Sequence, residues 1–259
     1  MKKVIAFDLD GTLASSKSPL ADRMSEALNH LLDNFQVCVI SGGKFEQFQK
    51  QLLANLNASP DKLEKLHLMP TCGTRYYTYN LSKHDWDQVY AEDFTKAEKD
   101  KIIDALNKGF DDLNLREKEV YGETIEDRGS QVTFSVLGQD IVDVLGEKGV
   151  EMKENWDPNN SKKKKVRDYV APLIPEFEVR VGGVTSIDVT KLGIDKAYGM
   201  KKLTELLEIS KDDILFFGDR IIEGGNDYPV KLAGIDSLQV SRWEDTALAL
   251  EAILAVVDK

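Results

Sequence analysis

The chain has 259 residues, of which 42% are hydrophobic and 31% are charged. This composition is typical of a soluble globular protein and excludes a disordered chain, and the length suffices for a large core with a smaller inserted domain. The net charge of −11 (34 basic against 45 acidic residues) argues against nucleic acid as a partner.

The first predicted strand is the apolar run at residues 4–7. Asp8 and Asp10 follow it two positions apart, so both side chains point to the same side of an extended backbone. Carboxylates are costly inside a sheet but suit the carboxyl end of a strand, where open α/β sheets bind ligands. Gly11 then allows a tight turn. Two carboxylates at such a turn suit a hard divalent cation, although a polar strand end with an ordinary Asp-Gly turn is the alternative.

Apolar residues at helical spacing predict a helix over residues 20–35, and residues 37–40 predict a second buried strand. This strand runs into Ser41, Gly42 and Gly43 before another helix begins. A hydroxyl and free backbone N–H groups at a helix start can hold a phosphate oxygen. For this motif alone, a plain strand-to-helix turn is the better explanation.

The next segments continue the alternation of helices and strands, which predicts a parallel, doubly wound α/β sheet. A different character follows, with an antiparallel strand, a charged helical segment, and strands in which polar and apolar residues alternate. We therefore expect residues 81–183 to form an α+β insert, the cap domain, within a core of residues 1–80 and 184–259. The run of lysines at 162–165 is interpreted as a solvated helix face.

The alternation resumes after the insert. A short strand is predicted at residues 186–189, and a helix at 194–207 contains Lys196 near its start. Residues 213–218 predict a strand that ends in Asp219, and Asn226 and Asp227 follow in a glycine-rich turn. Taken singly, Lys196 is an ordinary surface lysine and Asp227 a turn residue. Together with the first two motifs they form one set of groups at strand ends and helix starts.

Residues 8–12, Asp-Leu-Asp-Gly-Thr, resemble the first motif of the haloacid dehalogenase-like phosphotransferases. The resemblance implies that Asp8 is the nucleophile, that Asp10 is the general acid and base, and that Lys196 neutralises charge on the phosphoryl group. It further implies that Ser41 and Gly42 bind that group. The implied cofactor is Mg²⁺, held by Asp8, the backbone carbonyl of Asp10, Asp219, Asn226 and Asp227.

The position of the insert is similar to the Cof-type branch of that superfamily. Residues 183–189 and 216–227 are similar to eukaryotic-type phosphomannomutase, which implies four substrate-binding residues: Lys17, Arg128, Ser186 and Asp188. The chain also departs from that family. Tyr121 and Gln139 stand where two cap arginines are expected, and the second motif reads Ser-Gly-Gly in place of Gly-Gly-Ser. Loss of bidentate arginine contacts should weaken binding of a second phosphate more than it harms hydrolysis.

The expected function is a Mg²⁺-dependent phosphatase that hydrolyses a small phosphorylated metabolite, a sugar phosphate, through an aspartyl-phosphate. Phosphomannomutase is the alternative, and a non-catalytic protein that binds a phosphorylated ligand is the alternative of another class. Cys38 and Cys72 are expected to be reduced thiols. Neither a signal peptide nor a membrane span is predicted, so we expect a cytoplasmic protein. The sequence leaves the oligomeric state open between a monomer and a homodimer formed through the cap.

Overall fold

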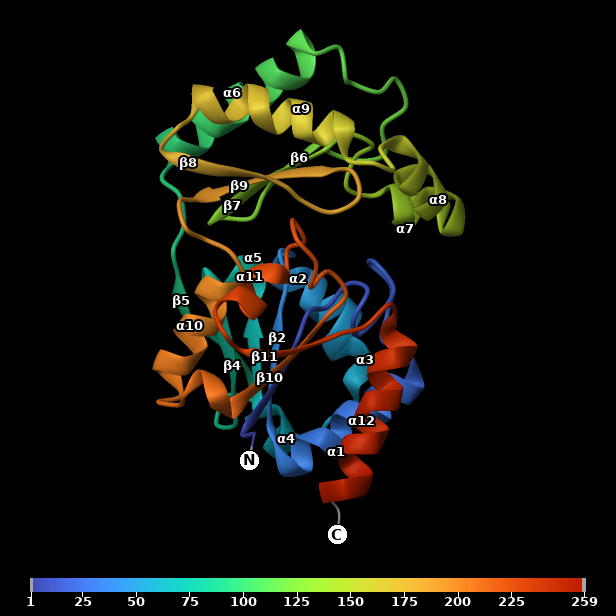
Figure 1. Ribbon diagram of the computed structural model, residues 1–259, viewed down its shortest axis with the longest axis vertical. Helices are drawn as coiled ribbons and strands as arrows, with labels where there is room; N and C mark the ends of the chain where they lie inside the picture. The colour runs from blue at the N-terminus through green and yellow to red at the C-terminus, as the bar shows by residue number, and fades with distance from the viewer. Residues whose placement is uncertain (1, 258–259) are drawn as a thin grey trace. The chain divides into compact units, whose positions relative to one another are not determined.

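The computed structural model describes residues 2–257. The chain divides into two compact units, which are described separately (Figure 1). The first unit contains the residues up to Ala91 and those from Asp195 onward, and the second unit is Glu92–Ile194. The chain thus leaves the first unit once and returns to it, as expected for an inserted domain.

The first unit is built on a seven-stranded sheet with the order β11-β10-β1-β2-β3-β4-β5. The first five of these strands are parallel, and β4 and β5 add an antiparallel edge. The strand bounds are β1 Val4–Phe7, β2 Gln36–Ile40, β3 Leu66–Met69, β4 Arg75–Asn80, β5 Asp85–Ala91, β10 Ile214–Gly218 and β11 Asp236–Gln239. Central strands β1, β2 and β3 carry near-continuous apolar runs because helices cover both faces.

Each face of this sheet has its own hydrophobic core. On one face α1, the α2–η1–α3 segment and α12 pack against alternate strand residues such as Phe7 and Val39. On the other face α10 and α11 pack against the intervening residues such as Ala6 and Ile40. The helix bounds are α1 Asp22–Asn34, α2 Phe45–Phe48, η1 Gln49–Leu53 (a π-helical turn), α3 Ala54–Leu56, α4 Pro60–Leu63, α5 Pro70–Gly73, α10 Lys196–Leu206, η3 Lys211–Asp213, α11 Tyr228–Leu232 and α12 Trp243–Val257. These layers confirm the predicted doubly wound α/β fold.

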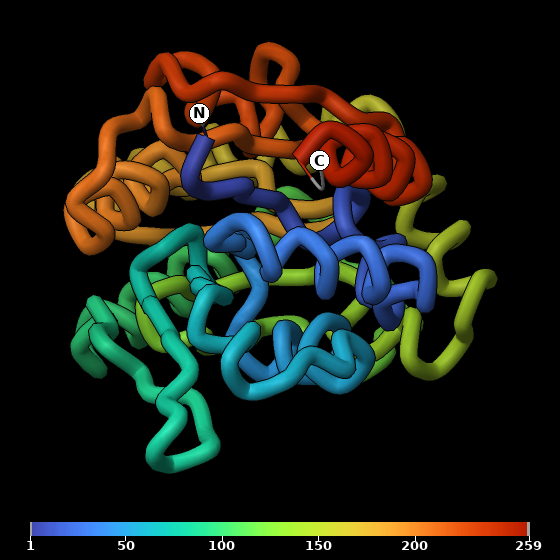
Figure 2. The backbone as a smooth tube through the Cα atoms, turned by 90° about the horizontal axis from the view of Figure 1, so that it is seen from below, coloured from blue at the N-terminus to red at the C-terminus, as the bar shows by residue number. Residues whose placement is uncertain are grey.

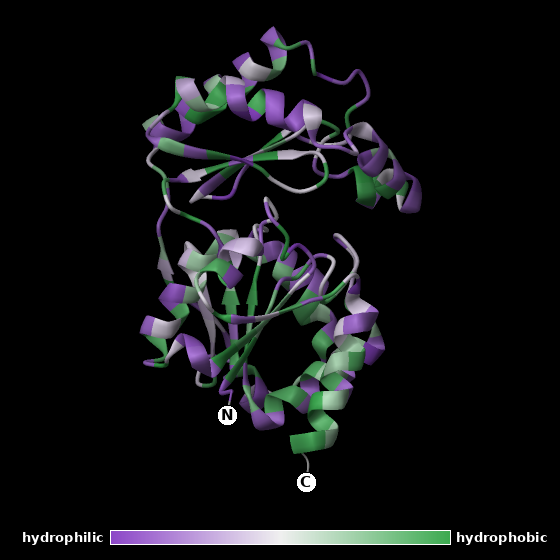
Figure 3. Cartoon of the chain, in the orientation of Figure 1, coloured by the Kyte–Doolittle hydropathy of each residue, from purple (hydrophilic) through white to green (hydrophobic). Residues whose placement is uncertain are grey.

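Helices α1 and α12 come from opposite ends of the chain and lie side by side (Figures 1 and 2). Leu28 of α1 and Leu250 of α12 are buried in the same core. At the surface, the guanidinium of Arg23 donates to both carboxylate oxygens of Glu251, at 2.7 and 2.9 Å. Figure 3 shows that α12 is largely apolar, in agreement with its place against the sheet.

The second unit has a four-stranded antiparallel sheet with the order β6-β7-β9-β8. Its strands are β6 Ile125–Asp127, β7 Gln131–Ser135, β8 Phe177–Val181 and β9 Ser186–Lys191. Its helices are α6 Lys96–Asp112, α7 Ile141–Leu145, α8 Glu147–Trp156, α9 Ser161–Val170 and η2 Ala171–Leu173. This arrangement confirms the predicted α+β character of the insert.

Only one face of this second sheet is apolar, which is the usual pattern for an antiparallel sheet. Val132 and Phe134 of β7 pack under α6 and α9, where the ring of Phe110 stacks on Phe134 at a centroid distance of 3.7 Å. The alternate residues, such as Thr133 of β7 and Asp188 of β9, point to the opposite face. A polar sheet face is therefore built into this unit.

The observed boundaries of the units differ from the expected ones. The second unit begins at residue 92 and ends at 194, so each boundary lies eleven residues later than expected (92 against 81, and 194 against 183). The hairpin strand β5 pairs with β4 and extends the first sheet. Strand β9, which was expected to resume the core, pairs instead between β7 and β8. Ser186 and Asp188 consequently lie on the second unit.

Candidate active site

Three carboxylates meet in the first unit. Asp8 follows β1, Asp219 follows β10, and Asp227 precedes α11. Each offers an oxygen atom, and these oxygens all lie within 4.8 Å of one another. Because β1 and β10 are adjacent and parallel, their carboxyl ends bring Asp8 and Asp219 to the same edge of the sheet.

Lys196, the first residue of α10, lies against this cluster. Its Nζ is 2.7 Å from Oδ1 of Asp8 and 2.5 Å from Oδ1 of Asp227. The Lys196 side chain is fully buried, and those of Asp8 and Asp227 are at most 5% exposed. The other oxygen of Asp227 accepts a hydrogen bond from the backbone N–H of Arg220 at 3.0 Å. Asp227 therefore fixes both the lysine and the turn after β10.

The charges of this cluster do not balance. Three carboxylates face the ammonium group of Lys196 and the guanidinium of Arg220, which lies 3.7 Å from Asp219, so a formal charge of −1 remains when all five groups are ionised. Burial raises the pKa of Asp8 well above its ordinary value, although Lys196 opposes the shift. Burial, together with the neighbouring Asp227, also raises the pKa of Asp219. For Lys196, burial acts to lower the pKa, but Asp227 and Asp8 outweigh it and the pKa lies above its ordinary value. A divalent cation with oxygen ligands would offset the missing positive charge.

Two glycines allow the close approach of these carboxylates. Gly11 has φ +84°, and a β-carbon placed on it would lie 2.6 Å from Oδ2 of Asp219. A β-carbon on Gly218, the last residue of β10, would lie 2.6 Å from Cγ of Asp227. The glycine of the first motif therefore does more than make a turn, because it leaves room for a carboxylate from another strand.

The second motif forms a loop between β2 and α2. Ser41 is buried, and its Oγ accepts a hydrogen bond from the backbone N–H of Gly43 at 3.2 Å. A second loop braces it, since Ser41 O accepts from the N–H of Cys72 and Gly43 O accepts from the N–H of Thr71. Thr71 and Cys72 both have positive φ, near +50°, so this bracing loop is held in a sparsely populated backbone conformation.

The structure turns Asp10 toward a different set of partners. Oδ1 of Asp10 accepts from the backbone N–H of Lys17 at 2.7 Å and from Nε2 of Gln51 at 3.2 Å. Oδ2 of Asp10 accepts from Nε2 of Gln47 at 2.8 Å. Lys17 itself has φ +54°. Of the two other expected site residues here, Gly42 is partly buried in the Ser41 loop and Asn226 is exposed in the turn before Asp227.

On the second unit, Arg128 and Asp188 belong to one polar group. The Arg128 side chain is only 10% exposed and is paired with Glu126, at 2.7 Å from Nη2 to Oε2. Oδ1 of Asp188 accepts from the hydroxyl of Thr133 at 2.7 Å. Burial raises the pKa of Asp188, while the positive charge of Arg128 acts in the opposite direction. Arg128 and Asp188 are therefore close enough to interact electrostatically, and the carboxylate of Glu126 lies beside the arginine.

The other residues singled out on this unit are Ser186, which follows the β8–β9 connection, and Tyr121 and Gln139, which lie before β6 and after β7. Ser186 begins β9, and its carbonyl accepts from the N–H of Gly182 at 2.9 Å. Tyr121 and Gln139 lie on two neighbouring segments, because the N–H of Tyr121 donates to Leu137 O and the N–H of Gln139 donates to Glu123 O, each at 3.0 Å. The two positions that depart from the arginine pattern are thus neighbours in space.

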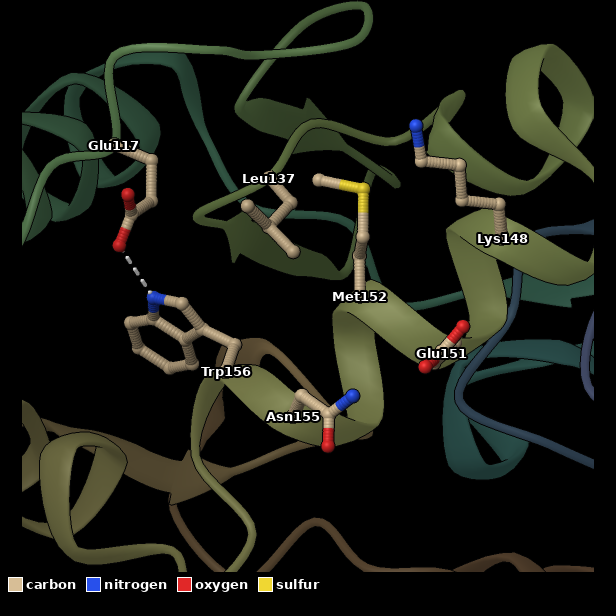
Figure 4. A pocket seen from close by; sticks show the side chains of 7 residues that line it. All are labelled: Glu117, Leu137, Lys148, Glu151, Met152, Asn155 and Trp156. Atoms are coloured by element: carbon tan, nitrogen blue, oxygen red, sulfur yellow. Dashed lines mark hydrogen bonds between the residues drawn. The ribbon is translucent and has the colours of Figure 1, made fainter.

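Figure 4 shows a pocket of about 440 Å³ elsewhere on the second unit. Met152 and Trp156 of α8 line it, and the indole N–H of Trp156 donates to Glu117 at 2.8 Å. Its charged lining groups are one lysine, Lys148, and two glutamates. This charge balance does not suit a phosphate, and none of the expected site residues line the pocket.

Sequence reasoning missed four residues that contact the expected site residues in the structure. Gln47 and Gln51 contact Asp10, Glu126 pairs with Arg128, and Thr133 contacts Asp188. One signal was available for the first pair, since residues 47 and 51 are four apart on a predicted helix that follows the second motif.

Among the described residues 2–257, no helix is long and apolar enough to span a membrane.

Comparisons with known proteins agree on the fold and the family. A model of the haloacid dehalogenase-like hydrolases matches residues 5–230. A phosphomannomutase from Encephalitozoon cuniculi is 26% identical over 248 residues, which cover 95% of this chain and 91% of the relative. Phosphomannomutase 1 of Mus musculus is 28% identical over 233 residues, covering 86% and 81%. An IMP-nucleotidase structure from Plasmodium falciparum has a TM-score of 0.69 at 17% identity and covers 98% of this chain and 68% of that one.

Proposed function

Since the chain belongs to the haloacid dehalogenase-like hydrolases, we propose that it is a Mg²⁺-dependent phosphatase for a small phosphorylated metabolite, a sugar phosphate. In this proposal the first unit is the catalytic core and the second is the cap that contacts the rest of the substrate. The observation that carries the proposal is the cluster of Asp8, Asp219 and Asp227, in which Lys196 is buried against Asp8 and Asp227.

Asp8 acts as the nucleophile. A carboxylate oxygen of Asp8 forms a bond to phosphorus as the bond from phosphorus to the leaving oxygen breaks, which produces an aspartyl-phosphate. Asp10 gives its proton to the leaving oxygen and then takes a proton from the water that attacks the aspartyl-phosphate. This second step releases inorganic phosphate and restores the carboxylate of Asp8.

The surrounding groups position the phosphoryl group and neutralise its charge, which is most of what phosphoryl transfer requires. Lys196 is held by Asp227 beside Asp8, so its ammonium group is available to both the nucleophile and a phosphoryl oxygen. Ser41 and the backbone N–H groups of its loop bind the phosphoryl oxygens. Mg²⁺, when held by Asp8, Asp219 and the backbone carbonyl of Asp10 with Asn226 and Asp227 nearby, supplies charge neutralisation between the carboxylates and the phosphate.

The cap residues favour hydrolysis of the phosphate ester over transfer of its phosphoryl group to a second position of the sugar. A mutase has to hold a second phosphate group while the bisphosphate intermediate turns round. Arg128 is already paired with Glu126, so its positive charge is largely neutralised within the cap. Tyr121 and Gln139 bring no fixed positive charge. The Thr133–Asp188 pair suits the hydroxyl groups of a sugar, because Asp188 retains an oxygen that can accept from them.

Phosphomannomutase is the second candidate function. Curated relatives that align with most of this chain bear that name, at 26% and 28% identity. The same core chemistry would serve it, because the aspartyl-phosphate would then be passed to a sugar hydroxyl in place of water. The two functions differ in whether the cap retains the bisphosphate.

Product analysis distinguishes the two candidates. Mannose 1-phosphate would be incubated with the protein, Mg²⁺ and a trace of hexose bisphosphate, and free phosphate and mannose 6-phosphate would be measured over time. The proposal predicts that free phosphate forms faster than mannose 6-phosphate. Conversion to mannose 6-phosphate with little free phosphate would assign the mutase function instead.

A further inference from the structure

Asp10 is held by two glutamine side chains from the helical segment that follows the second motif. Gln47 lies on α2 and Gln51 lies in the π-helical turn η1, four residues further on. Nε2 of Gln47 donates to Oδ2 of Asp10 at 2.8 Å, and Nε2 of Gln51 donates to Oδ1 at 3.2 Å. We call Gln47 and Gln51 the glutamine pair. Both oxygens of the Asp10 carboxylate are thus engaged by amide donors.

The hydrogen-bond network determines which way each amide group points. Nε2 of Gln51 also donates to the backbone carbonyl of Ser18 at 2.9 Å, and a carbonyl can only accept. Nε2 of Gln47 also donates to Oε1 of Gln51 at 2.6 Å. Each amide therefore uses both of its N–H groups on acceptors, and a flipped amide would place oxygen against oxygen.

The glutamine pair is itself anchored to both neighbouring motifs. The Gln51 side chain is buried, and its backbone carbonyl accepts from the N–H of Leu20 at 2.9 Å. The side-chain oxygen of Gln47 faces Gly43, where a β-carbon would lie only 2.2 Å away. The pair thus joins the turn that carries Asp10 to the loop that carries Ser41. A π-helical turn at this place agrees with the frequent occurrence of such turns at functional sites.

We propose that Gln47 and Gln51 are positioning residues that set the orientation of the Asp10 carboxylate for proton transfer to the leaving oxygen. The inference rests on the proposed function, in which Asp10 is the general acid. A carboxylate on a turn has free rotation about its side-chain bonds, and proton transfer needs hydrogen-bond geometry between donor and leaving oxygen. Two anchored amides restrict that rotation without adding charge.

The test compares two substrates that differ in how much they need a proton on the leaving oxygen. The leaving group of a sugar 6-phosphate is a poorly stabilised alkoxide, which needs a proton from the acid. The leaving group of p-nitrophenyl phosphate is a stable phenolate, which needs that proton far less. Gln47→Leu should lower kcat/KM for the sugar phosphate by at least about tenfold, within the roughly 10²- to 10⁴-fold that a positioned acid contributes. The aryl phosphate should be changed much less, so the ratio of the two values should shift.

Gln49→Leu is the matched control, because Gln49 lies on the same helical segment and is exposed. It should leave both values of kcat/KM near those of the parent protein. Equal losses on both substrates for Gln47→Leu would indicate a merely structural role and would overturn the proposal, as would no loss on either.

A second measurement tests the contact without turnover. In a ¹⁵N–¹H spectrum, Asp10→Ala should shift the side-chain amide signals of Gln47 and Gln51 and leave that of Gln49 in place. Absence of those shifts would contradict the hydrogen bonds between the glutamine pair and Asp10, and so the proposal, whatever the activity. A parent protein that hydrolyses neither substrate but shows the shifts would instead contradict the proposed function.

Discussion

Lys196 and Asp8 form an ion pair in which neither side chain is more than 5% exposed, with 2.7 Å between Nζ and Oδ1. The same ammonium group lies 2.5 Å from Asp227. Breaking a buried ion pair leaves a charge without compensation, so we expect Lys196→Met to lose roughly 3–5 kcal/mol of stability in the metal-free protein. Turnover should be lost as well. Thermal unfolding in chelator measures the first effect, and an unchanged Tm would contradict the role of this pair.

Asp8→Asn should abolish turnover while the fold is retained, because an amide is a far poorer nucleophile than a carboxylate. The raised pKa of Asp8 adds a second expectation. An acid whose folded-state pKa lies above its unfolded value loses stability as the pH rises through that range. Lys196 keeps Asp227 as its partner in this variant, so removing the Asp8 charge should raise the Tm of the metal-free protein at neutral pH, as is common when active-site residues are replaced. A lower Tm, or phosphatase activity near the parent rate, would count against the assignment.

Chelation should stop activity, and added Mg²⁺ should restore it, because three clustered carboxylates would otherwise repel a phosphate. A cation that binds only the folded protein also stabilises it, by about 2.7 kcal/mol at a hundred times its Kd. Mg²⁺ should therefore raise the Tm of the parent protein and have a smaller effect on Asp219→Asn. Full activity in excess chelator would show that no metal is needed.

Gly199→Ala tests how α10 is seated. A β-carbon on Gly199 would lie 2.4 Å from Cδ1 of Ile40 and 2.8 Å from the carbonyl oxygen of Cys72. Overpacking of this kind costs about 1–3 kcal/mol, and a shift of α10 that relieved it would also displace Lys196, the first residue of that helix, relative to Asp8. We expect a lower Tm and reduced kcat. Lys201→Ala, an exposed change on the same helix, should alter neither.

We expect His67 to make the stability of the first unit depend on pH. Its ring nitrogens lie 2.8 Å from the hydroxyl of Tyr76 and 2.7 Å from Oε1 of Gln36. Burial lowers the pKa of His67 from 6.5 to about 4. Between these values the unfolded chain binds more protons than the folded one, so stability falls as the pH drops from 6.5 toward 4. The loss is on the order of 3 kcal/mol.

His67→Gln should reduce this slope in unfolding experiments at several pH values. His30→Gln is the control, because His30 is exposed. If both variants kept the slope of the parent protein, His67 would not be its source.

Local sequence patterns were sufficient for much of the fold. Apolar runs at residues 4–7 and 37–40 became β1 and β2, and the helical spacing at 20–35 became α1. Such patterns show which face of a helix or strand is buried, and this depends only on the residues of that helix or strand. They placed β4 in the core but assigned β5 to the insert, and they did not identify β9 as part of the second sheet, because apolar patterns do not say which strands pair.

The sequence by itself determined the residue types of the site: Asp8 and Asp219 at the ends of apolar strands, and Lys196 at a helix start. The tertiary structure alone decided their partners. Gln47 and Gln51 reach Asp10 across 37 and 41 residues, and Lys196 reaches Asp227 across 31. The pairing of Arg128 with Glu126 is different, because these residues are only two positions apart and the alternation along an extended backbone could have indicated it. Hydrogen bonds and ion pairs act over a few ångströms, and only the folded backbone brings groups so distant in the chain within that range.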